Sequence, residues 1–315
     1  MGVEMPADWT ERFWFCHRLA SRFKYETEEL ADFYIHRRLA ALLVALMGAM
    51  DMPWFFTPNR ITFVSLFFGL VSAYFAYIAT DDMSMFFWAG VCEVLSITFD
   101  CCDGQLARMY QNGSLVGRVL DGLVDMTVAL SHGFTWTYIL VYKYEYLNPV
   151  VGFVILAVSI VTFQQQAMIY DRIKNLYVLK TAPKKEDATV GLEEGVILQR
   201  EMDAAWASNS YISYLLLLWY QQQYLAVQNA VSKKSVESHL KEKDALSPEE
   251  YRKQWKSTMR LVSWCGTGTH SFLFYALLFA VYFFQDPRAL IAWYFINNVI
   301  ISYCWYVSWS RVEFM

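Results

Sequence analysis

The sequence predicts an all-α integral membrane protein with six transmembrane helices, preceded by an N-terminal amphipathic helix in the membrane interface. Its 315 residues are 56% hydrophobic and only 18% charged, whereas soluble domains are about 45–50% apolar and about 25% charged. Apolar stretches of about 20 residues recur along the chain, and lysine and arginine gather on one side of them. The net charge of −4 offers no basic surface for nucleic acid. The six cysteines show no disulfide or zinc spacing, so we expect them to be reduced packing residues.

Residues 1–56 are expected to form a juxtamembrane segment. Between residues 8 and 25, apolar side chains recur at helical spacing, and the basic side chains fall largely on other faces. The apolar stripe consists of Trp9, Phe13, Cys16, Leu19, Ala20 and Phe23. Asp8 and Glu11 are placed to cap the start of this helix. A helix of this kind suits the headgroup layer of a bilayer.

Six apolar stretches approach the roughly 20 residues that a helix needs to cross a bilayer. They are residues 61–80, 84–99, 126–142, 149–170, 261–284 and 289–309. Among Asp, Glu, Lys and Arg, these stretches contain only Glu93, in the second of them. The second stretch continues as a helix past Asp100, and the third extends back toward Gly117. Six crossings place both termini on one side.

The basic residues orient these helices. With the N-terminus in the cytosol, 24 of the 26 lysines and arginines lie inside, and Lys143 and Arg288 lie outside. Segment 171–259 exceeds the length of about 60 residues within which the positive-inside rule is reliable. Without that segment the ratio is 11 to 2, so we expect the termini on the cytosolic side.

A membrane domain is expected over residues 57–315, interrupted by a polar, helix-prone cytosolic insert at about 171–259. The insert includes a charged stretch at 180–187, glycines at 191 and 195, and a Lys/Glu-rich stretch at 233–256. Within it, residues 211–227 are apolar at one end and interrupted by three glutamines, which favours an amphipathic or core helix. The alternative is a seventh span, which would move the C-terminus outside.

One segment of the sequence contains the candidate catalytic and metal-binding residues. Its pattern is D-x2-D-G-x2-A-R-x8-G-x3-D-x3-D, and its fixed residues are Asp100, Asp103, Gly104, Ala107, Arg108, Gly117, Asp121 and Asp125. At about 3.6 residues per turn, the first two aspartates share one helix face, and so do the last two. Asn112 and Gly113 predict a turn between the two helices, so the pairs should meet at the cytosolic edge.

Four converging carboxylates predict a divalent metal site. They would repel one another unless hard cations neutralised them, and oxygen ligands favour Mg²⁺ or Mn²⁺. Two such ions can clamp a diphosphate for in-line displacement. Glycines in the motif leave room for a nucleotide or a neighbouring backbone, and Arg108 can hold an anion. The alternative is a structural cluster paired with Arg108 and Arg118, which the cost of intramembrane acids disfavours.

This segment resembles the signature of the CDP-alcohol phosphotransferase family (CDP-alcohol phosphatidyltransferases) and matches it without a gap. The resemblance implies six transmembrane helices, a cytosolic active site and a homodimer. Members transfer a substituted phosphoryl group from a cytidine diphosphate donor to an alcohol and release CMP. The implied step is attack by the acceptor oxygen on the β-phosphorus of the donor.

The family pattern also implies roles for single residues. Asp100, Asp103 and Asp121 would bind metal, and Asp125 would contact a second metal ion and act as the catalytic base. The residues expected around the cytidine and diphosphate are Asn59, Thr62, Gly104, Ala107, Arg108 and Gly117. Residues 57–62 resemble the family's opening of the first span, with an ordinary helix N-cap as the alternative.

The resemblance leaves the substrates open. CDP-diacylglycerol with a small water-soluble alcohol is the favoured pair, and a CDP-linked head group with a lipid alcohol such as diacylglycerol is the alternative. Two non-enzymatic alternatives are a cation transporter and a scaffold that binds cytidine nucleotides. Neither is favoured, because the carboxylates lie at one membrane edge rather than at the midplane, and no residue of the signature is missing.

Two further pairs of residues attract attention. Glu93 lies seven residues before Asp100, and His132 lies seven after Asp125, so both should lie two turns deeper on the aspartate-bearing faces. We expect them to meet. A buried pair that only fixes helix packing is the favoured interpretation, and the alternative hypothesis is that the pair shapes the acceptor pocket or the path of the departing proton. Arg172 and Lys174 are candidates for binding a phosphorylated acceptor or head group, with snorkelling at the membrane edge as the alternative.

Overall fold

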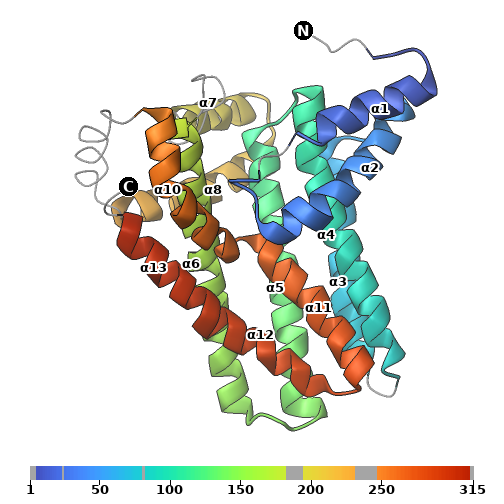
Figure 1. Ribbon diagram of the computed structural model, residues 1–315, viewed down its shortest axis with the longest axis vertical. Helices are drawn as coiled ribbons and strands as arrows, with labels where there is room; N and C mark the ends of the chain where they lie inside the picture. The colour runs from blue at the N-terminus through green and yellow to red at the C-terminus, as the bar shows by residue number, and fades with distance from the viewer. Residues whose placement is uncertain (1–4, 23–24, 80–81, 182–193, 231–246, 313–315) are drawn as a thin grey trace.

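The computed structural model describes residues 5–22, 25–79, 82–181, 194–230 and 247–312. Within these ranges the chain is helical and forms no strand. Its helices build an elongated bundle, with α1, α2, α7 and α10 at one end and connecting turns at the other (Figure 1). The helical elements are α1 (Trp9–Ala20), η1 (Asp32–His36), α2 (Arg37–Ala49), α3 (Pro58–Ile78), α4 (Ser84–Tyr110), α5 (Leu115–Tyr138), η2 (Ile139–Lys143), α6 (Pro149–Thr181), α7 (Glu194–Ala207), α8 (Tyr211–Ala230), α10 (Pro248–Val262), η4 (Ser263–Cys265), α11 (Thr267–Phe284), η5 (Pro287–Leu290), α12 (Ile291–Phe295), η6 (Ile296–Ile301) and α13 (Ser302–Val312).

Five helical stretches of the described chain are long and apolar enough to cross a membrane. They are Pro58–Ile78, Ser84–Tyr110, Pro149–Asn175, Thr267–Phe284 and Pro287–Arg311. This result supports a multi-pass membrane protein, although it gives one span fewer than the predicted six. The remaining candidate is α5, which is 24 residues long but carries Asp121, Asp125 and His132 among its apolar residues. A sixth span at α5 therefore stays a prediction.

The last two spans differ from their expected form. The fifth was expected to begin at residue 261, but α10 continues to Val262, a short 3-10 turn follows, and Gly266 adopts an extended conformation before α11 begins at Thr267. The final span is interrupted by the π-helical turn η6 between α12 and α13. Hydropathy detected both stretches, but it does not report where the backbone hydrogen-bonding pattern changes.

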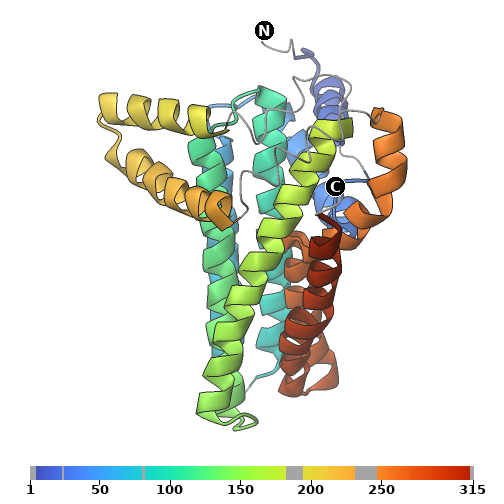
Figure 2. The same cartoon turned by 90° about the vertical axis from the view of Figure 1, so that its left-hand side faces the viewer.

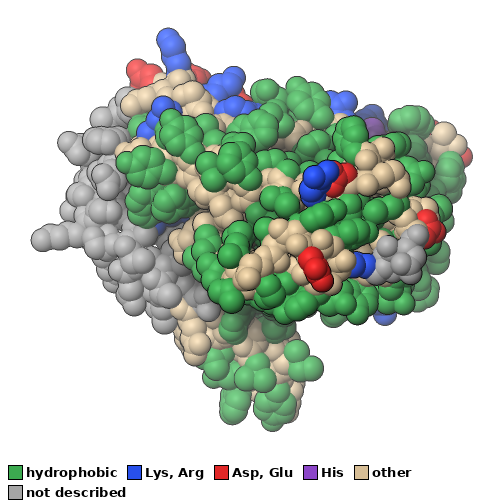
Figure 3. All heavy atoms as spheres, turned by 90° about the horizontal axis from the view of Figure 1, so that it is seen from below, with side chains coloured by type: hydrophobic (Ala, Val, Ile, Leu, Met, Phe, Trp, Pro, Cys, Tyr) green, Lys and Arg blue, Asp and Glu red, His purple; other side chains and the backbone are tan. Residues whose placement is uncertain are grey.

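The outer surface of the bundle is strongly apolar. Exposed side chains on α3 and α6 include Phe63, Phe67, Val150 and Val154. Seen from the end opposite α1, hydrophobic side chains cover most of the visible face, and charged ones are few (Figure 3). Apolar patches of this extent are unusual on soluble monomers and fit contact with lipid.

The N-terminal region contains two helices instead of the one expected. Helix α1 forms where the apolar stripe predicts it, and the carboxylate of Asp8 accepts a hydrogen bond from the backbone N–H of Glu11 at 3.0 Å. Its residues Cys16 and Ala20 are buried and belong to one apolar cluster with residues of α2 and α4, while Trp9 and Trp14 are exposed. Phe23 lies outside the described residues.

Helix α2 was not anticipated. Its buried face is made mainly of small residues and packs against α1 and α4. The opposite face exposes an apolar stripe at helical spacing that begins in η1, formed by Ile35, Leu39, Leu42, Leu46 and Met50. A continuous exposed stripe is the pattern of a helix that lies in the membrane interface, and α2 displays it more fully than α1 does.

The expected insert is partly described. Helices α7 and α8 form a hairpin that extends sideways from the bundle (Figure 2). The hairpin shares an apolar cluster with the start of α5, in which Leu198, Met202 and Leu217 join Leu115 and Val119. Helix α8 covers the expected amphipathic or core helix and is not among the five candidate spans. Residues 182–193 and 231–246 of the insert lie outside the described residues.

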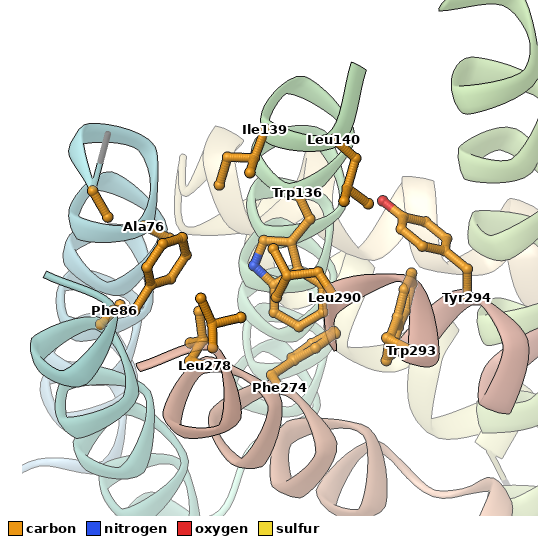
Figure 4. Close-up of a cluster of buried hydrophobic side chains, with 13 residues drawn as sticks. Ala76, Phe86, Trp136, Ile139, Leu140, Phe274, Leu278, Leu290, Trp293 and Tyr294 are labelled. Atoms are coloured by element: carbon orange, nitrogen blue, oxygen red, sulfur yellow. The ribbon is translucent and has the colours of Figure 1, made fainter. Parts of the chain in front are cut away.

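An apolar cluster packs the half of the bundle away from α1. Residues from α3, α4, α5, α11 and α12 meet in it, with Trp136 and Phe274 at its centre (Figure 4). The ring centroids of these two residues are 5.3 Å apart in an edge-to-face arrangement. Such a packed cluster fixes the spacing of α4 and α5, the two helices that carry the aspartates.

Candidate active site

The structure brings the four aspartates of the sequence pattern together. Asp100 and Asp103 project from α4, and Asp121 and Asp125 from α5. Carboxylate oxygens of Asp100, Asp103 and Asp121 all lie within 4.8 Å of one another. Asp125 lies beside this group and interacts with all three of its carboxylates. The spacing argument therefore placed these side chains correctly, and their roles stay predictions.

A tight turn makes this convergence possible. Helix α4 ends at Gln111, whose φ of 53° lies in the left-handed region, and the N–H of Asn112 donates to the carbonyl of Ala107 at 3.1 Å. The side chain of Ser114 then caps α5 by accepting a hydrogen bond from the N–H of Gly117 at 3.0 Å. The predicted turn is present, with its left-handed residue one position before the Asn-Gly pair.

The aspartate cluster fits a divalent cation. Ligand oxygens on opposite sides of one Mg²⁺ ion are separated by roughly 4.2 Å, and oxygens of the three carboxylates lie within a comparable 4.8 Å of one another. Oδ1 of Asp100 and Oδ1 of Asp121 are buried and have no hydrogen-bond partner in the described chain. Thr62 donates a hydrogen bond to Asp103, which fixes that carboxylate. Buried carboxylates without compensation are costly, so the site is suited to bind a hard cation.

The expected nucleotide-binding residues lie around the same end of α3, α4 and α5. A Cβ atom added to Gly117 would lie 3.1 Å from Oδ1 of Asn59, so the glycine allows the two helices to approach. A Cβ at Gly104 would meet only the guanidinium of Arg108, at 3.6 Å, which leaves open space beside Asp103. Arg108 and Asn59 are exposed and Ala107 is partly exposed. Thr62 is buried and donates a hydrogen bond to Asp103, and its expected place beside the nucleotide stays a prediction.

Sequence reasoning missed a second polar cluster. Residues 26–32, here called the acidic segment, contain Glu26, Glu28, Glu29 and Asp32. Glu28 pairs with Arg37 at 2.9 Å and with Lys174 at 3.4 Å. The carbonyl of Arg37 accepts a hydrogen bond from Gln105 of α4 at 3.0 Å, so the acidic segment is linked to the helix that carries Asp103. The sequence feature that could have revealed this cluster is the presence of four acidic residues within seven positions, next to an apolar stripe.

The acidic segment also caps α11. The carboxylate of Glu29 accepts hydrogen bonds from the backbone N–H groups of Gly268 and Thr269. Burial, and next the nearby charge of Asp32, raise the pKa of Glu29 to about 8. Burial alone would raise the pKa of Asp32 as well, but the hydrogen bond to His36 and the charge of Arg37 lower it below its usual range.

Lys174 and Arg172 have different surroundings. Lys174 contacts Glu28 and the hydroxyl of Tyr170, at 3.4 and 3.3 Å, so its charge is already paired within the protein. Arg172 is partly buried. Of the two, Arg172 is the better candidate for binding a phosphate group.

Glu93 and His132 meet as predicted. Nε2 of His132 lies 2.8 Å from Oε2 of Glu93, and both side chains are at most 1% exposed. The seven-residue offsets from Asp100 and Asp125 therefore placed this contact correctly. The contact itself does not decide between a packing role and a role in the reaction.

Comparison with known proteins adds one match. Residues 55–184 match the family model described as CDP-alcohol phosphatidyltransferase. This range contains α3, α4, α5 and α6 and all eight fixed residues of the signature. No curated protein matches the chain.

Proposed function

Since residues 55–184 match the CDP-alcohol phosphatidyltransferase family model, we propose that this protein transfers a substituted phosphoryl group from a CDP-linked donor to an alcohol in phospholipid synthesis and releases CMP. CDP-diacylglycerol is the favoured donor, and a small polar alcohol is the favoured acceptor. The observation that carries the proposal is the approach of Asp100, Asp103 and Asp121 to within 4.8 Å, beside Asp125.

The aspartates provide the ligands for two divalent ions, Mg²⁺ or Mn²⁺. Asp100, Asp103 and Asp121 would hold one ion, and Asp125 would contact the second. When bound, the ions neutralise the donor diphosphate and stabilise the charge that develops on the leaving CMP. The unpartnered buried oxygens of Asp100 and Asp121 support this assignment.

Asp125 acts as the base in this proposal. It accepts the proton of the acceptor hydroxyl while the acceptor oxygen attacks the β-phosphorus. The new O–P bond forms as the bond from that phosphorus to the CMP oxygen breaks. Arg108 can pair with diphosphate oxygens. Asn59, Thr62, Gly104, Ala107 and Gly117 would shape the nucleotide site around it.

The setting of the reaction is also proposed. Residues 57–315 would form one membrane domain, with α5 as its sixth span and the insert at about 171–259 in the cytosol. The 11-to-2 distribution of basic residues outside segment 171–259 supports cytosolic termini and a cytosolic active site. The exposed stripe of α2 supports a place for that helix in the headgroup layer. The family resemblance supports a homodimer.

The deciding experiment is magnesium-dependent CMP release by the purified protein in lipid micelles. CDP-diacylglycerol and CDP-linked head groups are offered separately, each with candidate alcohols, and Asp125→Asn serves as the control. CMP from CDP-diacylglycerol and a small alcohol would support the favoured pair. CMP from a CDP-linked head group and diacylglycerol would reverse the donor assignment and preserve the mechanism.

The non-enzymatic alternatives make different predictions. A nucleotide-binding scaffold would bind cytidine nucleotides without turnover, and a transporter would move Mg²⁺ or Mn²⁺ across sealed vesicles. No CMP from any donor, with folding and metal binding intact, would contradict the transferase proposal and favour one of these two.

A further inference from the structure

A small cavity lies directly below the aspartates, toward the centre of the bundle. Its volume is about 20 Å³, and helices α3, α4, α5, α6 and α11 contribute to its wall. The polar residues that line it include Asp100, Asp125, Glu93, Ser65, Ser96 and Ser271. The cavity therefore joins the two aspartates to Glu93.

Glu93 is fixed from the opposite side. Its bond to His132 uses Oε2, so the other carboxylate oxygen can accept a hydrogen bond from a molecule in the cavity. His132 is held in turn by Phe274, with ring centroids 5.1 Å apart, and by Trp136, at 5.7 Å. Figure 4 shows these two aromatic residues at the centre of the apolar cluster. Glu93 thus lies in the cavity wall, and His132 with the aromatic residues around it fixes its position.

The dimensions suit a small polar group. The axial rise between Glu93 and Asp100 along α4 is about 10.5 Å, and the cavity lies between them, since its wall includes both carboxylates. A volume of about 20 Å³ admits one water molecule or a group of similar size. Glu93 and the serine hydroxyl groups provide partners for a hydroxyl group. Ser65 and Ser96 also bond to each other, so an acyl chain would chiefly leave the second carboxylate oxygen of Glu93 without a partner.

We propose that Glu93, held by His132, is a positioning residue that accepts a hydrogen bond from a second hydroxyl or an ammonium group of the acceptor alcohol. The acceptor thereby lies with its reacting hydroxyl at Asp125. This inference rests on the proposed function and narrows its substrate class to small alcohols that carry a second hydrogen-bond donor. Diacylglycerol, with one hydroxyl group and no second donor, does not meet this requirement.

The test measures acceptor and donor kinetics of the purified protein in lipid micelles with Mg²⁺. The probes are myo-inositol, glycerol 3-phosphate, L-serine and diacylglycerol. Loss of a charge-assisted hydrogen bond weakens binding by about tenfold or more. Glu93→Gln should therefore raise the KM of the polar acceptor by about that factor and leave the KM of the donor unchanged. His132→Leu should act in the same way, and His132→Gln, which keeps a donor for Glu93, should retain most of the wild-type KM.

A second buried histidine provides the matched control. His270 is also fully buried, and its Nε2 lies 3.0 Å from Oε1 of Gln166, but it is not part of the cavity wall. His270→Gln should lower the melting temperature without changing the acceptor KM. Glu93→Gln and His132→Leu variants that lose stability while keeping the wild-type acceptor KM would show a packing pair and overturn the inference.

Two further outcomes would also overturn it. Wild-type protein that uses diacylglycerol and none of the polar alcohols would keep the proposed reaction but remove the acceptor class inferred here. Absence of CMP release by the wild-type protein with every donor would overturn the proposed function itself, and this inference with it.

Discussion

At the scale of single residues, Asp125 is set apart from the other three aspartates. The oxygens that approach to within 4.8 Å belong to Asp100, Asp103 and Asp121, while Asp125 lies beside them and faces the cavity. This position gives it access both to the diphosphate site and to an acceptor hydroxyl. A base has to reach the proton that it removes, and the position of Asp125 at the cavity supports its proposed role.

We predict that Asp125→Asn lowers kcat by about 100- to 10,000-fold, the usual contribution of a general base. Asp103→Asn should lower activity and also shift the Mg²⁺ dependence of CMP release to higher concentrations, because it removes a ligand. In a Mg²⁺ titration, high Mg²⁺ should restore part of the activity of Asp103→Asn but not that of Asp125→Asn, which lacks the base as well as a metal contact. Asp125→Asn activity within tenfold of wild type would contradict the assignment.

Glu29 leads to a prediction about pH. Its pKa is raised to about 8 by burial and by Asp32, whereas in the unfolded chain it stays near the ordinary value of about 4.3. The folded protein therefore binds more protons between these two values, and stability falls with rising pH by at most about 1.4 kcal/mol per pH unit. The contribution of Glu29 to folding stability is complete below about pH 4 and is lost as the pH rises through about 8.

The measurement is the apparent melting temperature of the detergent-solubilised protein between pH 5 and 9. Glu29→Gln should flatten the decline seen in the wild type, while Glu249→Gln, at an exposed position, should reproduce the wild-type curve. An identical pH dependence in wild type and Glu29→Gln would show that Glu29 does not titrate in this range.

At the scale of helices, the active site depends on how closely α3 approaches α5. A Cβ atom added to Gly69 would lie 2.5 Å from a methyl group of Val128 and 3.0 Å from Oγ of Ser96. Val128 lies one turn beyond Asp125 on α5. A larger residue at position 69 would therefore displace the helix that carries Asp121 and Asp125.

We predict that Gly69→Ala costs about 1–3 kcal/mol of stability, as overpacking usually does, and lowers CMP release. Adding Val128→Ala should restore much of both losses. Gly122→Ala is the matched control, since a Cβ at Gly122 meets nothing within 4 Å and helical alanine is favoured over glycine by roughly 0.5–1 kcal/mol. Equal stability of Gly69→Ala and Gly122→Ala, measured by thermal unfolding, would contradict this account of the close approach.

Some features of the helices could be predicted from sequence patterns, and others could not. Local features were predictable: the aspartate pairs, the turn between α4 and α5, and the contact of Glu93 with His132 all follow from helical spacing. The break at Gly266 and the second N-terminal helix were not. Both involve the acidic segment: Glu29 caps α11, and Glu28 pairs with Arg37, the first residue of α2. Contacts between residues more than 230 positions apart leave no periodic signal in one sequence.

At the scale of the whole molecule, the helices α3, α4, α5, α6, α11 and the final span alternate in direction (Figure 1). The turn at residues 111–114 and the acidic segment lie at the end that also carries α1 and α10, while the loop at residues 144–148 lies at the other. With cytosolic termini, the turn at residues 111–114 is also cytosolic, and the loop at residues 144–148 faces the opposite side of the membrane.

This topology is testable with single reporter cysteines. An impermeant maleimide should label Glu145→Cys in intact cells, and it should label Asn112→Cys only after the membrane is permeabilised. Both positions are exposed, and five of the six native cysteines are buried, so the unmodified protein provides the background. Labelling of Asn112→Cys in intact cells would reverse the predicted orientation.

The contacts of the acidic segment also bear on the order in which the protein is assembled during synthesis. The backbone carbonyl of Glu28 accepts a hydrogen bond from the guanidinium of Arg260, 232 residues later. The carboxylate of Glu29 accepts one from the hydroxyl of Thr269, 240 residues later. Neither bond can form before these later residues have been synthesised. Helices α3, α4 and α5 are consecutive and can pair as they leave the ribosome, so the aspartate site is built early from neighbouring segments. Closure of loops this long is slow and comes last. The acidic segment is translated before α3 and is thus among the last segments to reach its final partners, which lie on α6, α10 and α11 around a site that has already formed.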